Sequence, residues 1–194
     1  MSRSTWRSVS AAAVMLTVMY PVASPRAQDI KFSCPKAGTA IEIKDLKMSW
    51  QGTVPGSPTT CLRTDIYQKS EEAIFNFYAD DVSGGKAARA AMADLFSGAK
   101  PKVEFLVVFK TTRETVNSTE TWTRLGREQI QVAGRAIDAW TFEQERRYST
   151  GLFHATRKLW FDPATGLFVK GSGKVLEGQA RNWPSWEYTA IKVP

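Results

Sequence analysis

Residues 156–174 of the chain read TRKLWFDPATGLFVKGSGK. Two segments rich in aromatic and β-branched residues, 156–161 and 167–174, flank the short connection DPATG. Proline sets the backbone for a turn, and glycine adopts a positive φ at little cost. The pattern therefore predicts a β-hairpin with its turn at residues 162–166.

Further β-strands are expected on both sides of this hairpin. Gly52–Thr60 contains Pro55, Gly56 and Pro58 and is expected to be a loop. Val103–Phe109 is almost entirely apolar, which is typical of a strand buried on both faces. The expected strands are 41–49, 61–68, 73–79, 103–109, 119–125, 128–132, 136–146, 156–161, 167–174 and 186–193.

One helix is predicted, at Lys86–Phe96. Its apolar residues Ala88, Ala91, Met92, Leu95 and Phe96 recur at helical spacing. Ser83 is a suitable N-cap, and Gly98 and Pro101 follow the last turn. The apolar face of this helix predicts that it packs on a sheet.

Several of the expected strands carry apolar residues on both faces. In 136–146, Trp140 and Phe142 point one way, while Ile137 and Ala139 point the other way. A sheet covered on one side alone would alternate more regularly. The second side is therefore covered by the helix, by sheet curvature or by a ligand. We expect a mainly β protein of the α+β class: a curved antiparallel meander sheet, or half-barrel, with one main helix on it.

The N-terminus has the layout of a secretory signal peptide. Arg3 and Arg7 precede the uncharged stretch 11–20, which is too short to span a bilayer. Small residues follow, so cleavage is expected after Ala27, or alternatively after Ala23. Residues 28–194 are then expected to form a single β-rich domain in the bacterial periplasm or outside the cell.

The net charge changes when this segment is removed. The whole chain has 26 basic and 19 acidic residues, a net charge of +7. Residues 1–27 contain Arg3, Arg7 and Arg26 and no acidic residue, so 23 basic residues remain against 19, which is +4. A charge of this size favours solubility and specifies no nucleic-acid partner. No second long apolar run predicts a transmembrane segment in the mature chain.

Cys34 and Cys61 are the two cysteines of the chain. An exported protein meets an oxidising environment, which favours an intrachain disulfide between them. A reactive thiol or an intermolecular bridge is the alternative. With two cysteines and one histidine, the chain is not expected to hold zinc through His and Cys ligands, and no metal or cofactor is predicted.

The sequence holds few candidate catalytic residues. His154 is the single histidine, and no Gly-x-Ser-x-Gly turn accompanies it. Glu143 and Glu145 lie about 7 Å apart on one strand face, a spacing that a carboxylate-dependent glycosidase could use. That hypothesis predicts a raised carboxyl pKa in a cleft. No catalytic residue is assigned, and a binding protein is expected rather than an enzyme.

Four aromatic residues on neighbouring strands are the candidate ligand-binding residues: Trp122, Trp140, Phe142 and Trp160. Large aromatic side chains dominate the energetics of cores and of binding sites alike. The set could form a plain hydrophobic core, an apolar groove for a lipid-like ligand, or a platform for stacking sugars.

Part of the chain resembles a known group of proteins. The segments WTRLGRE (122–128), IQVAG (130–134) and RKLWFDPATGLFVK (157–170) are similar to bacterial periplasmic domains of unknown function. The architecture of those domains resembles the half-barrel of the LolA and LppX lipoprotein carriers. The likeness covers about residues 119–175. It implies a periplasmic β-rich fold and no catalytic residue.

From these observations we expect an exported, non-enzymatic module that binds or carries a lipid-like or amphipathic ligand on an aromatic sheet face. A filled core with an exposed patch near Trp183 and Trp186 would instead favour a cell-envelope protein that docks another protein. A glycoside hydrolase using Glu143 or Glu145 is the remaining alternative.

Overall fold

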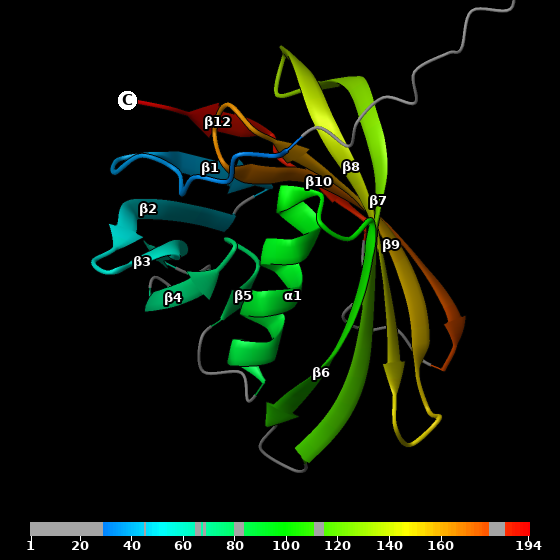
Figure 1. The fold of residues 1–194 in the computed structure, drawn as a ribbon. Coiled ribbons are helices and arrows are strands. Elements are labelled where there is room, and N and C mark those ends of the chain that lie inside the picture. The colour runs from blue at the N-terminus through cyan, green and yellow to red at the C-terminus, as the bar shows by residue number, and fades with distance from the viewer. Residues whose placement is uncertain are drawn as a thin grey trace, which may run out of the picture.

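The computed structural model describes residues 29–44, 46–64, 67, 69–79, 84–110, 115–178 and 185–194 (Figure 1). The expected signal peptide, Ser83 and Trp183 lie outside this range. Within it, the chain is mainly β-strand with one helix, which confirms the predicted fold class.

The described strands form two antiparallel sheets. The first sheet has the order β12-β1-β2-β3-β4-β5. Its strands are β12 (Ala190–Lys192), β1 (Ala40–Ile43), β2 (Leu46–Val54), β3 (Ser57–Thr64), β4 (Ser70–Ile74) and β5 (Tyr78–Ala79). The C-terminal strand β12 thus pairs with the first strand of the described chain.

The second sheet is the expected meander, in the order β11-β10-β9-β8-β7-β6. Its strands are β6 (Lys102–Lys110), β7 (Thr115–Val132), β8 (Arg135–Tyr148), β9 (His154–Asp162), β10 (Leu167–Glu177) and β11 (Trp186–Glu187). The predicted hairpin at residues 162–166 joins β9 to β10. The strands predicted at 119–125 and 128–132 are one strand, β7, with an irregularity between Arg124 and Gly126.

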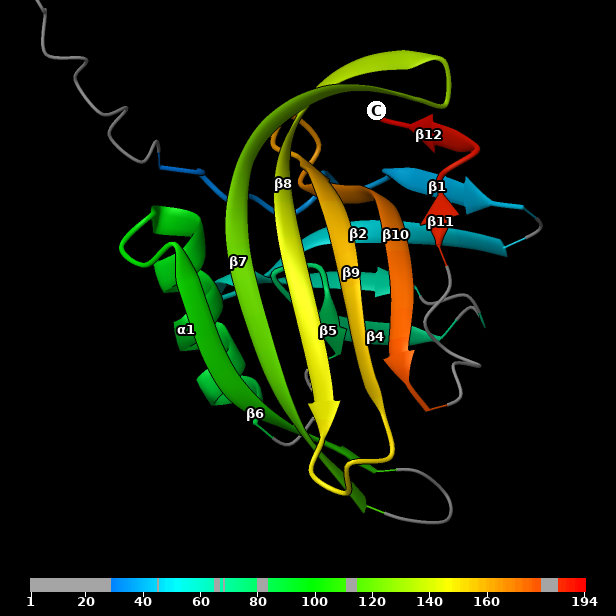
Figure 2. The ribbon, with the colours of Figure 1, turned by 90° about the vertical axis from the view of Figure 1, so that its right-hand side faces the viewer.

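Helix α1 (Gly85–Ser97) lies between the two sheets and covers one side of the second (Figure 1). In Figure 2 the curved strands of the second sheet run upright, and those of the first lie crosswise behind them. The N-cap position of α1 is Gly84 rather than the expected Ser83, and no side chain caps the first turn. Gly98 ends the helix in a left-handed conformation, as the sequence predicts.

Five sequence predictions were wrong in detail. The strand expected at 41–49 is two strands, β1 and β2, and the strand expected at 186–193 is divided between β11 in the second sheet and β12 in the first. The segment Gly52–Thr60, expected to be a loop, is mostly strand. A tight turn alone separates the end of β2 at Val54 from the start of β3 at Ser57. The strand expected at 73–79 is broken by Phe75 and Asn76, which have φ values of 48° and 56°. Strand β6 is not buried on both faces, since Glu104 and Leu106 are exposed. Propensity and hydropathy are local, and tertiary context overrode them at each of these places.

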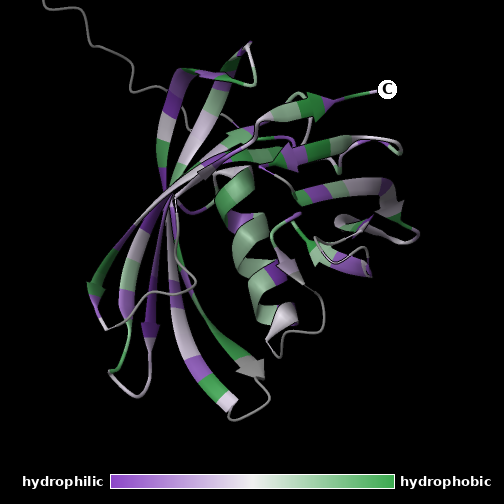
Figure 3. Ribbon diagram, turned by 180° about the vertical axis from the view of Figure 1, so that it is seen from behind, coloured by the Kyte–Doolittle hydropathy of each residue, from purple (hydrophilic) through white to green (hydrophobic). Residues whose placement is uncertain are grey.

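The apolar residues form two main clusters. The first contains the buried face of α1 and the side of the second sheet that the helix covers. The second lies around Ile41, Trp50 and Cys61 of the first sheet and includes Trp160. Figure 3 shows hydrophobic residues along α1 and alternating hydrophobic and hydrophilic residues along the strands. The second sheet therefore has apolar contacts on both sides, as its sequence indicates.

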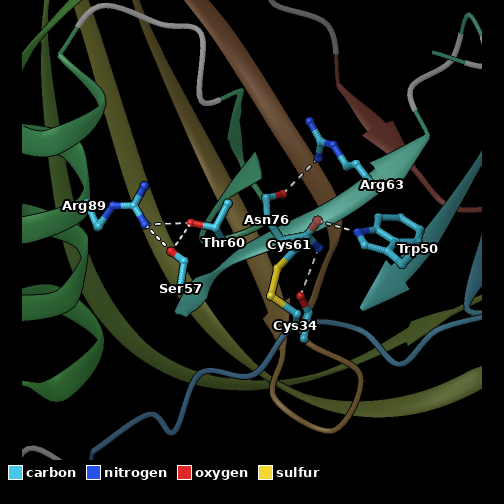
Figure 4. Close-up of a disulfide and its surroundings, with 9 residues drawn as sticks. Cys34, Trp50, Ser57, Thr60, Cys61, Arg63, Asn76 and Arg89 are labelled. Atoms are coloured by element: carbon cyan, nitrogen blue, oxygen red, sulfur yellow. Dashed lines mark hydrogen bonds between the residues drawn. A yellow bond between two sulfur atoms is a disulfide. The ribbon is translucent and has the colours of Figure 1, made fainter. Parts of the chain in front are cut away.

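The expected disulfide between Cys34 and Cys61 is present (Figure 4). Close to it, the indole nitrogen of Trp50 donates a hydrogen bond to the Asn76 side-chain oxygen at 2.6 Å. The Asn76 amide nitrogen donates to the backbone oxygen of Gly166 at 3.0 Å. These contacts tie the first sheet to the β9–β10 hairpin of the second.

Candidate functional site

The helix-covered side of the second sheet is the predicted aromatic surface, and the protein's own side chains fill it. Trp122 and Phe142 are fully buried. The ring of Phe96, from α1, stacks on Phe142 with centroids 5.2 Å apart. The ring of Phe77 meets Trp122 edge-on at 4.9 Å. In the described part of the chain, this centre therefore offers no exposed aromatic surface.

Strand register shows that the four candidate ligand-binding residues do not share one side of the sheet. Trp140 pairs with Phe161, and Phe142 with Leu159, on the helix-covered side. Trp160 pairs with Thr141 and points to the opposite side. The structure thus brings Trp122, Trp140 and Phe142 together and separates Trp160 from them.

The other two tryptophans of the candidate set, Trp140 and Trp160, lie among charged side chains. Trp140 is half-buried, with the guanidinium carbons of Arg124 and Arg127 at 5.3 and 5.6 Å from its ring centre. The Trp160 indole donates a hydrogen bond to the Glu128 carboxylate at 3.2 Å, and the Lys158 ammonium lies 4.8 Å from its ring centre. Both are cation–π arrangements at the edge of the core.

A buried polar cluster lies next to the aromatic rings, on the same helix-covered side of the second sheet. We call it the Glu120 cluster. It consists of Tyr78, Glu120, Trp122, Gln144 and Arg146. The Glu120 carboxylate accepts hydrogen bonds from the Gln144 amide at 2.6 Å, from the Tyr78 hydroxyl at 3.2 Å and from Arg146. The Trp122 indole donates to the Tyr78 hydroxyl at 2.7 Å. Strand β5 is thereby tied to β7 and β8.

Burial shifts the pKa of several groups here. It raises the pKa of Glu120, against the opposing effect of Arg146. It also raises the pKa of Tyr78, to which the nearby Glu120 charge adds. Arg157, which pairs with Gln144 in the sheet, has its pKa lowered to about 10, first by burial and then by Arg146. Since Glu120 is fully buried, we interpret this cluster as a structural link rather than as a catalytic group.

The glutamates considered for hydrolysis lie on the opposite side of the sheet. Glu143 is exposed. Glu145 is bonded to Arg147 at 2.8 Å and to His154 at 2.8 Å. The hydrogen bond from Arg147 lowers the pKa of the Glu145 carboxyl, and His154 adds to this effect. The shift is opposite to the one that a general acid requires.

The β7–β8 hairpin extends past its neighbours in the second sheet, and we call its end, residues 125–139, the ribbon. Pairing of β6 with β7 stops at Thr123, and pairing of β8 with β9 stops at Trp140. Among the described strands, the ribbon strands beyond these points pair only with each other. Figures 1 and 2 show this hairpin curling over the top of the molecule.

The two faces of the ribbon differ. On the inner face, Val132, Ile137 and Ala139 are buried in the second apolar cluster. On the outer face, the side chains of Gln129, Gln131, Ala136 and Asp138 are exposed. The strands are joined by Ala133 and Gly134, with φ values of 50° and 72°, which is typical of a type I′ turn. Packing of the inner face holds a two-stranded element that would be marginal alone.

A hollow of about 410 Å³ lies at the ribbon. Its lining residues are Gln129, Ile130, Gln131, Ala136, Ile137 and Asp138. The volume falls within the range typical of ligand pockets. Asp138 forms an ion pair with Arg127, so the remaining polar groups of the lining are two uncharged amides.

Sequence reasoning did not identify the Glu120 cluster or the ribbon hollow. Ser118 and Glu120 share a side of β7 with Trp122 but are polar, so hydropathy gives no sign of their burial. The ribbon has one sequence signal: Ala133-Gly134-Arg135, which can form a turn, lies between the expected strands 128–132 and 136–146. How far the hairpin extends beyond its neighbours depends on strand register, which the turn does not reveal.

Comparisons with known proteins found little. No protein family matches the sequence, and no curated protein is similar to it. Among solved structures, the chain is similar to the hypothetical lipoprotein YmcC from Escherichia coli K12, at 12% sequence identity and a TM-score of 0.47. The match covers 72% of this chain and 79% of that one. A similarity of this extent assigns neither a fold nor a function. No helix in the described part of the chain is long and apolar enough to cross a membrane.

Proposed function

We propose that this protein is an exported, non-enzymatic module of the bacterial cell envelope that docks another protein through the ribbon. The observation that carries the proposal is that, among the described strands, those of the ribbon pair with each other alone, which leaves two backbone edges beside an exposed hollow. Unpaired strand edges are ready templates for another chain. The filled aromatic face adds support, because it leaves no preformed groove for a ligand in the described core.

Export belongs to the same proposal. Residues 1–27 act as a signal peptide, and residues 28–194 fold as one domain in the periplasm or outside the cell. The disulfide between Cys34 and Cys61 supports an oxidising compartment.

Site-specific photocrosslinking in the source bacterium tests the docking proposal. A photoreactive amino acid at Leu125 or Arg135, both exposed on the ribbon and outside the lining of the hollow, should give a discrete adduct with an exported protein. The same group at Glu143, exposed on the opposite side of the sheet, is the control and should not. The partner is then purified, and its binding to the mature chain is measured. Adducts that are equal at all three positions, or that are absent, would contradict the proposal.

Carriage of a lipid-like ligand is a second candidate, favoured by the position of α1. This alanine-rich helix covers the aromatic side and is flanked by Gly84 and Gly98, both in the left-handed conformation. The guanidinium of Arg89 donates hydrogen bonds to the hydroxyls of Ser57 and Thr60 at 2.5 and 2.6 Å, which tie the helix to the first sheet (Figure 4). A ligand would occupy the aromatic surface after α1 moved away.

Native mass spectrometry of the gently purified mature protein tests the carriage candidate. A retained mass that organic solvent extracts would support carriage and identify the ligand class. Carriage would be excluded if the spectra show the bare chain and an added apolar dye does not change its fluorescence. Neither result bears on docking at the ribbon.

A further inference from the structure

The outer face of the ribbon presents two side-chain amides in regular array. Gln129 and Gln131 are both exposed and lie two residues apart on β7. Their side chains therefore point the same way, about 7 Å apart. Opposite them in the register lie Asp138 and Ala136. The small Ala136 side chain leaves open space opposite Gln131.

The chemistry of this array matches that of an extended polypeptide. Each primary amide offers two donors and one acceptor oxygen, the same kinds of group as a peptide backbone. An extended chain presents backbone N–H and C=O groups toward one side at a repeat of about 7 Å. Gln129 and Gln131 can thus each bond one backbone unit of such a chain.

Charge contributes little to this surface. Asp138 is paired with Arg127 across the two ribbon strands, with their side chains about half exposed. An ion pair that is satisfied within the protein exerts only a weak field on a ligand, and salt screens it further. Recognition in the hollow would then depend on hydrogen bonds to amides rather than on the charge of the partner.

We propose that the hollow binds an extended, uncharged segment of the partner protein, read through its backbone by Gln129 and Gln131. This inference rests on the proposed docking function and names the form of the partner. Hydroxyl-rich ligands such as oligosaccharides could also bond amides, but the two-residue spacing favours a peptide.

The test uses the mature, oxidised protein with synthetic peptides of random sequence and, in parallel, a panel of oligosaccharides. Peptide binding is expected, with Gln129→Ala/Gln131→Ala weakening it about tenfold through two lost hydrogen bonds. Thr119→Ala/Thr121→Ala is the matched control. These residues have the same spacing on β7 but pair with Arg147 and Glu145, on the opposite side of the sheet from Gln129 and Gln131. The control variant should bind as the unmodified protein does. N-methylation of the peptide backbone should abolish binding, and added salt should change it less than about twofold.

Other outcomes overturn the inference. The inference fails if the protein binds oligosaccharides but no peptide, or if no peptide binds at all. It also fails if the glutamine variant binds peptide with the same affinity as the unmodified protein. Circular dichroism and the thermal midpoint of both variants confirm that they fold. If the glutamine variant binds the crosslinked partner normally, the docking function stands and the peptide inference fails. If no crosslinked partner exists, the docking function itself fails.

Discussion

The side-chain amide of Gln144 on β8 donates a 2.6 Å hydrogen bond to the carboxylate of Glu120 on β7, and both residues are fully buried. Buried polar groups of this kind are costly unless each finds a partner. The Tyr78 hydroxyl from β5 supplies a further donor to the carboxylate. This contact explains how a two-residue strand at the end of the first sheet is fixed against the second.

The Glu120 carboxyl should make stability depend on pH. Its pKa is raised by burial above its ordinary value of 4.5, so the folded state holds this proton more tightly than the unfolded chain does. The stabilisation is therefore complete below about pH 4 and is lost as the pH rises through the folded pKa. Urea unfolding of the unmodified protein and of Glu120→Gln from pH 4 to 8 measures this. The difference in unfolding free energy between the unmodified protein and Glu120→Gln should shrink as the pH rises. If the two proteins show the same dependence on pH, the expectation is wrong.

The disulfide should contribute strongly to stability. Cys34→Ala/Cys61→Ala should lower the free energy of unfolding by about 3–4 kcal/mol, because the bond closes a loop with a sequence separation of 27 residues. Chemical denaturation of the variant measures the loss. The unmodified protein under reducing conditions should shift equally, and an unchanged midpoint in both cases would contradict the expectation.

Phe96 should be the main anchor of α1. It is 2% exposed and contacts Phe142, Phe161 and Phe168. Phe96→Ala should lower the unfolding free energy by about 3–5 kcal/mol through the cavity left in the core. Leu106→Ala is the control, because Leu106 is 62% exposed, and it should change stability by less than about 0.5 kcal/mol. Equal losses in the two variants would show that Phe96 does not anchor the helix.

Gly166 and Gly134 should respond differently to alanine. Both have a φ of +72°, but a Cβ atom at Gly166 would lie 2.1 Å from the backbone oxygen of Ser33, whereas nothing lies within 4 Å at Gly134. Gly134→Ala should cost about 1–2 kcal/mol from backbone strain alone. Gly166→Ala should cost about 1–3 kcal/mol more, since the N-terminal segment must also move. Thermal unfolding compares them, and equal shifts would contradict the close approach seen here.

Much of the local structure could be predicted from the sequence. The turn residues DPATG specified the β9–β10 hairpin, and the 3.6-residue period with Gly98 located α1. Two cysteines in a chain with an expected signal peptide left one intrachain pairing, and Cys34 and Cys61 form it. These features depend on a few neighbouring residues or on a count, so no knowledge of distant contacts was needed.

The candidate site could be predicted only in part. Trp140 and Phe142 share one side of β8, as alternation predicts. Trp122 lies on that side and Trp160 does not, because strand register decides which residues of neighbouring strands share a side. Whether that side was open could not be inferred, since Phe96 and Phe77, which fill it, come from other elements.

The sequence by itself determined the β9–β10 hairpin and the helix, because turn chemistry and hydrophobic period act over a few residues. It determined the disulfide because two cysteines allow one intrachain pairing. Tertiary structure alone decided that the N-terminal strands form a separate sheet, the first sheet, and that Glu120 is buried. It also decided that the ribbon strands have no further partner among the described strands. Each of these depends on contacts between residues far apart in the chain, such as Tyr78 with Glu120 and Asn76 with Gly166. Local periodicity carries no record of which distant segment covers a given face, and only the packed fold specifies that.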